Sequence, residues 1–270
     1  MLPTEMSCVN AENTSDWTIL VLELDNASRV VGESLKDIYK DMVVSVHRDI
    51  NYFNKEDIKK FLSKIPIPNT KVLGVWGNGC FHQYTYGLCT AIADRRSKSY
   101  GYVHIDHHSD TADYDMPINF SCGGFVASIL RDSNAQTVRF IGNAGFPFKN
   151  LEGKFSGTRY LSESGLRGKK SNSINVGRLE HLLEGTPEDL YISMDLDVID
   201  MNEISTSFRG GSVGGTITSE ELLKILRLMD ERKNIIGADV LGYSGRGWGI
   251  DLYGAIADTL IKKRSYNRDS

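Results

Sequence analysis

Short runs of apolar residues recur along the chain at lengths that predict buried strands. Seven such runs, rich in Val, Ile and Leu, cover residues 17–24, 41–47, 71–77, 99–106, 137–143, 189–199 and 234–243. Segments with helical periodicity lie between several of them, over residues 54–65, 85–96, 123–132 and 218–233. Strands that alternate with helices in this way form a mostly parallel sheet covered on both faces. The pattern therefore predicts an α/β fold.

The helix expected over residues 218–233 carries its own start signal. Thr218 is followed three residues later by Glu221, which is the spacing of a capping box. A chain of 270 residues, 40% of them hydrophobic, can bury a sizeable core. We therefore expect one domain over residues 1–270, with a frayed polar end over residues 262–270.

Charge and composition narrow the classes of partner. The net charge is −4 and no long basic run is present, which argues against binding to nucleic acid or to an anionic membrane. No secretory signal opens the chain, and no stretch approaches the ~18 apolar residues of a membrane span. The four cysteines lack C-x-x-C spacing and suit a reducing compartment. These features predict a cytoplasmic protein with a small-molecule or protein partner, and they leave the oligomeric state open, homo-oligomer included.

Candidate chemistry concentrates in the stretch HIDHHSD, residues 104–110. Alternate residues of an extended segment share a face, so His104, Asp106 and His108 project one way and His107 the other. Asp110, in the following loop, continues the alternation on the same side as Asp106 and His108. The stretch therefore places metal-binding groups on one side of a strand end.

Two further segments end strand-like runs with similar groups. Asp195 and Asp197 share a face in YISMDLDVID, and His82 follows the run KVLGVWG. A lone Asp-x-His or Asp-x-Asp is usually a satisfied loop pair, but their joint occurrence favours a cation that offsets the repulsion between carboxylates. Four carboxylates and two imidazoles exceed the needs of one tetrahedral zinc and suit two octahedral divalent ions, such as Mn²⁺. The predicted ligands are His82, Asp106, His108, Asp110, Asp195 and Asp197.

At these segments the sequence resembles the ureohydrolase family of arginases and agmatinases. That family carries a histidine in G-G-x-H-S, then D-A-H-x-D, then S-x-D-x-D-x-x-D-P; HQYTYG, DHHSD and SMDLDVIDM align with them over roughly residues 70–260. The resemblance implies a three-layer α/β/α fold and a binuclear manganese site. By its pattern, Asp106 and Asp195 bridge the ions, His82 and Asp110 complete one, and His108 and Asp197 complete the other.

The resemblance also implies a reaction. Two metals roughly 3.5–4 Å apart would supply hydroxide near neutral pH, and its attack on a guanidinium carbon would release urea and an amine. Asp110 is the expected acceptor of a hydrogen bond from the hydroxide and the group that passes its proton to the leaving amine.

Departures from the family pattern concern the substrate. The guanidinium-binding glutamate of the family's D-x-x-E segment is replaced by Gly242, although Asp239 remains. Another acidic or carbonyl group must therefore serve if the substrate carries a guanidinium, although each carboxylate considered, taken alone, is more often a surface charge. The candidates are Asp113, Asp115, Glu203 and Asp251.

Other positions receive more modest interpretations. Cys122 replaces a proton-shuttling histidine of the family. We interpret it as a small buried thiol beside the site and not as a nucleophile. A helix N-terminus would lower the pKa of this thiol. His104 contacts the ligands or belongs to the core, and His107 packs in the core or against a helix. His47 and His181 lack an acidic cluster, and Met201, in place of a proline, is a loop detail.

The substrate prediction rests on groups that the chain lacks. Residues 111–121 do not match the Asn, Thr and Ser groups with which arginases hold a free amino-acid end. We therefore predict conversion of arginine to ornithine within a peptide or protein. Two alternatives stay open: a small free guanidino or amidine substrate (arginine, agmatine or a guanidino acid), and a metal-binding pseudoenzyme scaffold. A single-metal deacetylase would leave His82 and two carboxylates unexplained.

Overall fold

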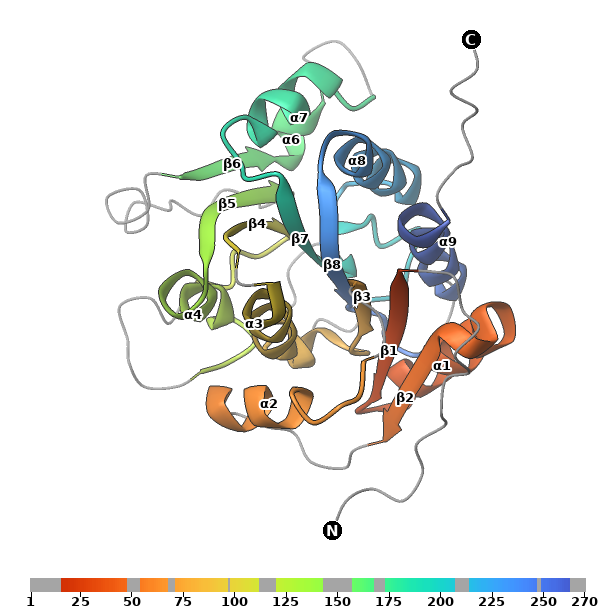
Figure 1. The fold of residues 1–270 in the computed structure, drawn as a ribbon. Coiled ribbons are helices and arrows are strands. Elements are labelled where there is room, and N and C mark those ends of the chain that lie inside the picture. Colours follow the sequence, from red (N-terminus) through yellow and green to blue (C-terminus); the bar gives the residue numbers. More distant parts are fainter. Residues whose placement is uncertain are drawn as a thin grey trace, which may run out of the picture.

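The computed structural model describes residues 16–47, 54–67, 71–96, 98–111, 120–142, 157–167, 173–206, 214–246 and 249–262. Within these ranges, eight parallel strands form one twisted sheet in the order β2-β1-β3-β8-β7-β4-β5-β6 (Figure 1). The strands are β1 (Trp17–Glu23), β2 (Val43–His47), β3 (Lys71–Val75), β4 (Tyr100–Ile105), β5 (Ala135–Gly142), β6 (Thr158–Ser162), β7 (Asp189–Asp195) and β8 (Asn234–Leu241).

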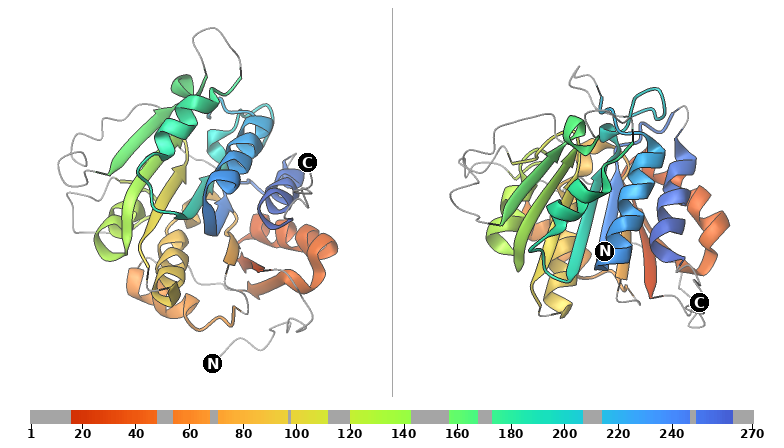
Figure 2. Two further views of the ribbon diagram at one scale, coloured as in Figure 1. Left: turned by 45° about the horizontal axis from the view of Figure 1, so that its top comes forward. Right: turned by 90° about the horizontal axis from the view of Figure 1, so that it is seen from above.

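Helices cover both faces of the sheet, as Figure 2 shows. One layer packs around a shared apolar cluster and contains α1 (Asn26–Tyr39), α7 (Val176–Leu183), α8 (Ser219–Arg232) and α9 (Ile250–Ile261). The opposite layer contains α2 (Lys55–Leu62), α3 (Tyr84–Arg96) and α4 (Phe125–Asp132). Short helices lie in the connections: η1 (Lys40–Met42), η2 (Gly79–Phe81), α6 (Glu163–Leu166) and η4 (Leu196–Val198). The expected α/β fold with three layers is confirmed.

The two layers explain why the strands read as continuous apolar runs. Along β1, Ile19 and Val21 join the cluster under α1, α8 and α9, whereas Leu20 and Leu22 join the cluster under α2 and α3. Because both faces are buried, no position of the strand can be given to a solvated polar side chain. Burial of apolar surface on two sides is therefore the main force that fixes this sheet.

Comparison with the predicted elements shows one missing strand. The seven apolar runs contain the other strands, but β6 was not predicted, because TRYLS is a short edge strand whose Arg159 and Tyr160 are exposed. The capping box is confirmed: Glu221 N donates to Thr218 Oγ1 at 3.1 Å and Thr218 N donates to Glu221 Oε2 at 2.9 Å. The expected frayed end lies, apart from Lys262, outside the described residues. Among the helices of the described ranges, none combines the length and apolarity that a membrane crossing needs.

The strand order brings distant segments together at one edge. β8 and β7 lie between β3 and β4, so the carboxyl ends of β3, β8, β7 and β4 are adjacent. Ligand sites in open α/β sheets form at such ends. The segments that follow β3, β4 and β7 carry the six predicted ligands, and the segment after β8 carries Gly242.

Candidate metal centre

The six predicted ligands gather at this edge, and His82 lies at the buried side of the group. It follows η2 and is 1% exposed. Its Nδ1 atom lies 2.9 Å from Asp110 Oδ2, 3.3 Å from Asp106 Oδ2 and 3.7 Å from Asp195 Oδ2. We call His82 and Asp110 the inner half of the centre.

His108 and Asp197 form the outer half. His108 Nδ1 lies 2.8 Å from Asp197 Oδ2 and 3.5 Å from Asp106 Oδ1. One oxygen of Asp106 therefore faces each half, the arrangement that a bridging carboxylate requires. Asp195 also lies between the halves, since Oδ2 faces His82 and Oδ1 accepts a hydrogen bond from Asp197 N at 3.0 Å.

Local backbone contacts fix these side chains. His108 N donates to Asp106 Oδ1 at 2.5 Å and His107 N donates to Asp197 Oδ1 at 3.2 Å, so the loop after β4 orients carboxylates of both strands. Asp110 adopts a left-handed backbone, φ 49°, and its carbonyl oxygen accepts a hydrogen bond from Val126 N of α4 at 3.2 Å. A strained residue that is not glycine is typical of functional loops.

Burial and mutual repulsion disfavour the charged forms of most of these carboxylates. Burial together with Asp197 and Asp106 raises the pKa of Asp195 well above its usual range, and burial with Asp106 raises the pKa of Asp110. Burial and Asp106 also raise the pKa of Asp197 to about 6. At Asp106, burial alone would raise the pKa of the carboxyl group. The neighbouring histidines outweigh burial and lower that pKa. The group therefore favours added positive charge.

The histidines respond in the complementary way. Burial opposes protonation of His82, but Asp106 and Asp110 outweigh it and raise its pKa well above the ordinary value. Hydrogen bonds that its ring donates to Asp106 and Asp197 raise the pKa of His108 to about 11. In both rings the atom that faces the carboxylates is Nδ1, where a metal ion would supply the charge that a proton otherwise supplies.

The tautomer of His82 also suits a metal. Its Nε2 lies 2.9 Å from Ser193 Oγ, and that hydroxyl donates to Asp239 Oδ1 at 2.8 Å. Because the hydroxyl hydrogen points to Asp239, Ser193 accepts from His82 Nε2–H, which leaves the Nδ1 lone pair toward the carboxylates. Nδ1 of His82 is buried and faces Asp110 Oδ2 and Asp106 Oδ2, but it makes no hydrogen bond of regular geometry among the described residues. The donor set therefore fits divalent cations.

A polar row inside the sheet supports the inner half. His104, Ser193 and Asp239 are neighbours in register on β4, β7 and β8, and all three are fully buried. Asp239 also accepts hydrogen bonds from Thr85 Oγ1 at 2.9 Å and Tyr191 OH at 2.6 Å. Sequence reasoning did not find this row. An aspartate within the apolar run 234–243 was the available signal, because unpaired carboxylates are rarely fully buried.

The remaining histidines occupy three environments. His104 Nε2 lies 3.1 Å from Asp106 Oδ2, and its ring stacks on His82 with centroids 5.2 Å apart, so His104 contacts the candidate ligands. His82, His104 and Asp106 also have donor atoms close enough to hold one ion, as do Asp106, His108 and Asp197. His107 pairs with Glu163 of α6 at 2.9 Å. At the surface, His47 lies 3.8 Å from Glu23 and His181 lies 2.8 Å from Glu184.

The expectation for the pKa of Cys122 is wrong in direction. Cys122 lies two residues before Gly124, the N-cap of α4, and is half-buried beside Asp110. Burial and then the Asp110 charge raise the pKa of its thiol. The nearby carboxylate and the loss of water outweigh the helix N-terminus. A thiol with a raised pKa is a poor nucleophile. Met201 lies in an exposed turn, as a loop detail should.

Gly242 is a position that admits no side chain. Its φ is +103°, and a Cβ atom built there would lie 2.2 Å from Asp195 Oδ1 and 2.8 Å from Leu196 N. Its amide donates to Gly77 O at 2.7 Å, which joins the ends of β8 and β3. A glutamate at 242 would therefore strain the backbone and displace Asp195. The backbone conformation at Gly242 therefore accounts for the absence of the glutamate.

Two of the four carboxylates considered as its replacement are among the described residues, and both are exposed. Glu203 is exposed and accepts a hydrogen bond from Ser219 N at 2.7 Å, and Asp251 is exposed in the first turn of α9. Asp113 and Asp115 lie outside the described residues.

Asp25 is a carboxylate near this end of the sheet that sequence reasoning missed. It caps α1 through Ser28 N at 2.8 Å, and its other oxygen accepts from Asn78 N at 3.2 Å and Asn78 Nδ2 at 2.7 Å. Asn78 in turn caps η2, the turn just before His82. Because both oxygens of Asp25 are already bonded, its role is to hold the His82 loop, and an N-cap aspartate before a helix was the signal for it.

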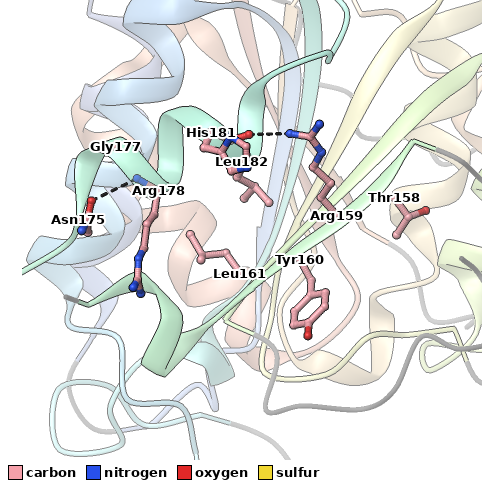
Figure 3. Close-up of a pocket in the computed structure, with 9 residues that line it drawn as sticks. All are labelled: Thr158, Arg159, Tyr160, Leu161, Asn175, Gly177, Arg178, His181 and Leu182. Atoms are coloured by element: carbon pink, nitrogen blue, oxygen red, sulfur yellow. Dashed lines mark hydrogen bonds between the residues drawn. The ribbon is translucent and has the colours of Figure 1, made fainter. Parts of the chain in front are cut away.

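A cavity of about 580 Å³ lies elsewhere, between β6 and α7 (Figure 3). Arg159 points toward α7 and donates to His181 O at 2.8 Å, while Arg178 donates to Gly165 O at 2.8 Å. The residues that line this cavity include none of the six candidate ligands. The metal centre and this cavity are therefore separate places on the molecule.

Two curated proteins are similar to this chain in sequence. Agmatinase from Pyrococcus horikoshii is 29% identical over 150 residues, which is 53% of this chain and 47% of that protein. N(1)-aminopropylagmatine ureohydrolase from Thermococcus kodakarensis is 23% identical over 198 residues, or 71% of this chain and 61% of that protein. The chain therefore spans less than two thirds of the length of these curated relatives.

Solved structures show the same fold. Proclavaminate amidino hydrolase from Streptomyces clavuligerus superposes with a TM-score of 0.69 at 18% identity, covering 91% of this chain and 90% of that one. A hypothetical agmatinase from Burkholderia thailandensis gives 0.67 at 19% identity, covering 92% and 84%. The model of the arginase family matches residues 34–245, well over half of the 270 residues. The chain therefore belongs to the arginase family.

Proposed function

We propose that the protein is a binuclear manganese hydrolase of a guanidino C–N bond that releases urea. The observation that carries this proposal is the convergence of four carboxylates and two imidazoles at the ends of β3, β4 and β7. Two manganese ions, when bound, supply hydroxide near neutral pH. His82, Asp110, His108 and Asp197 would complete the two ion sites, with Asp106 and Asp195 between them.

Asp110 is the residue that we propose moves the proton. Its carboxylate belongs to the inner half, where Oδ2 lies 2.9 Å from His82 Nδ1, so it is within reach of a proton released at the centre. It would take a proton at Oδ and deliver it to the leaving amine. Cys122, with a raised pKa, would contact this region without attacking the substrate.

The substrate that we propose is an arginine side chain within a peptide or protein, which becomes ornithine. The backbone at Gly242 excludes a carboxylate side chain at that position, and both oxygens of Asp25 already accept hydrogen bonds. A peptide can position its guanidinium through contacts remote from the reacting carbon, so it depends less on a clamp than a small free substrate does.

A small free guanidino compound is the second candidate. It is favoured by the two sequence relatives, whose names describe an agmatinase and an aminopropylagmatine ureohydrolase. A metal-binding scaffold without activity is the third candidate, since the clamp is missing. These candidates share the metal centre and differ in what the protein turns over.

One experiment separates them. The EDTA-treated chain is reloaded with Mn²⁺ and incubated separately with free arginine, agmatine and an arginine-containing peptide, and urea and product masses are measured. We expect a loss of about 42 Da, the arginine-to-ornithine change, in the peptide and little urea from the free compounds. The Asp195→Asn variant, treated alike, is the control for contaminating hydrolases.

Each contrary outcome promotes another candidate. Turnover of agmatine or free arginine beside an unchanged peptide would overturn the peptide assignment and keep the reaction. Binding of Mn²⁺ without urea from any guanidino compound would support the scaffold. A cytoplasmic location and a single domain over residues 1–270 stay predictions, which fractionation and limited proteolysis would test.

A further inference from the structure

Glu163 lies at a junction that the proposed chemistry does not use. It is the first residue of α6, and its side chain is only 11% exposed. One oxygen, Oε1, lies 2.9 Å from His107 Nδ1. The other, Oε2, accepts hydrogen bonds from Thr216 N at 2.9 Å and Thr216 Oγ1 at 2.7 Å. A single carboxylate thus joins the loop after β4 to the segment that precedes α8.

The two partners of Glu163, His107 and Thr216, are the two arms of this junction. Both lie next to backbone groups that contact the same candidate ligand, Asp197. On one side, His107 N donates to Asp197 Oδ1 at 3.2 Å. On the other, Gly215 N, next to Thr216, donates to Asp197 O at 2.7 Å, and Ile217 N donates to Val198 O at 3.2 Å. Asp197 Oδ2 in turn faces His108 Nδ1 at 2.8 Å. The contacts of Glu163 therefore converge on the outer half.

The histidines of the two halves are supported by different parts of the fold. His82 of the inner half rests on Ser193 and Asp239 inside the core. The His108 side chain is 34% exposed, and it follows β4 in an irregular segment. Positioning of such a ligand depends on side-chain contacts between loops.

We propose that Glu163 is a positioning residue that holds His107 and Thr216 and thereby sets the affinity of the outer half for its metal ion. The inference rests on the proposed binuclear centre and is independent of the substrate. Removal of the carboxylate should free both arms and loosen Asp197. The inner half, supported by the sheet, should keep its ion.

The test is a titration of the EDTA-treated full chain with Mn²⁺ by calorimetry. Glu163→Ala should weaken one of two ion sites by about 10- to 100-fold and leave the other unchanged. Glu163→Gln should stay within about tenfold of wild type, since its amide can accept from Thr216 and donate to a neutral His107. Glu184→Ala, which removes a comparable glutamate–histidine contact at His181, should bind as wild type does.

A double variant identifies the site that is lost. In a His108→Ala background, where the outer half is already disabled, Glu163→Ala should not weaken the remaining ion further. Hydrogen exchange of the metal-free Glu163→Ala protein should rise at residues 106–108 and 214–217 and stay unchanged at residues 190–194.

The outcomes separate this proposal from the function. Wild-type binding of both ions by Glu163→Ala, or equal weakening of both ions, would overturn the positioning role. Selective loss of one ion in a protein that hydrolyses no guanidino compound would support the role while the reaction fails. A wild-type chain that binds no divalent ion would overturn the centre and this inference together.

Discussion

The inner and outer halves of the candidate centre contain the same kinds of ligand but are held by different parts of the fold. His82 is 1% exposed and leans on Ser193 and Asp239, which lie in register on adjacent strands. His108 is 34% exposed at its side chain and depends on contacts between loops, among them those of Glu163. The histidine of the inner half is therefore supported by side chains of the sheet, and the histidine of the outer half by contacts between loops.

This difference teaches where each half is vulnerable. A buried row of hydrogen-bonded groups moves only if the sheet moves, because every member is fixed by backbone pairing. A loop junction can open without disturbing the core. Substitutions in the two supports should therefore act on different ions.

The largest effect should come from Asp195, which lies between the halves. Asp195→Asn removes a charge that faces His82 and reduces the anchor of Asp197. We expect loss of both ions and a fall in turnover of at least about a thousandfold, because metal-supplied hydroxide contributes several kcal/mol. Calorimetry and the urea assay measure this. Retention of one ion at wild-type affinity would contradict a bridging position.

A smaller effect confined to the inner half is expected from Asp239. Asp239→Asn weakens the acceptor of the Ser193 hydroxyl and so the orientation of His82. The affinity of the inner ion should fall about 10- to 100-fold while the outer ion is retained. Asp189→Asn on β7, at the opposite end of the strands, is the matched control. Equal weakening of both ions would show that the halves are not supported separately.

The pH dependence of stability should differ between the metal-free and metal-loaded protein. In the former, Asp197 has its pKa raised from 3.8 to about 6, so its stabilising contribution is full below 3.8 and is lost as pH rises through 6. The pKa of His108 is raised from 6.5 to about 11, so its contribution is full below 6.5 and declines progressively as pH rises toward 11. Metal binding needs deprotonated carboxylates and neutral rings. The difference in melting temperature between the metal-loaded and the metal-free protein should therefore increase as pH rises.

Melting curves from about pH 4 to about pH 8, with EDTA or with Mn²⁺, measure this gap. At Mn²⁺ concentrations near 100 times the dissociation constant, the stabilisation should be about 2.7 kcal/mol per site. A gap that is constant with pH would show that the buried carboxylates do not take part in metal binding.

The smallest effect is expected at Cys122. Its thiol is half-buried beside Asp110, with a raised pKa, and does not need to attack the substrate. Cys122→Ser should keep turnover within roughly tenfold and leave both ions bound. A covalent adduct trapped on Cys122 from substrate would contradict the proposed chemistry and join this residue to the reacting groups.

Much of this molecule could be predicted from local patterns. Continuous apolar runs identified seven strands, and the capping box at Thr218 marked the start of α8. The same runs placed Asp106, Asp195 and His82 at strand ends. Such features follow from periods of two and 3.6 residues and from chemistry that neighbouring residues share.

Other features depended on the order of strands, which no local pattern contains. β8 and β7 enter between β3 and β4, so Asp239 reaches Ser193, 46 residues away, and through it His82. β6, too polar to be recognised, places Glu163 against His107 and Thr216. The sequence by itself determined which groups could bind metal. The tertiary structure decided which buried groups support them, because contacts between distant strands are set by how two helical layers pack on one sheet.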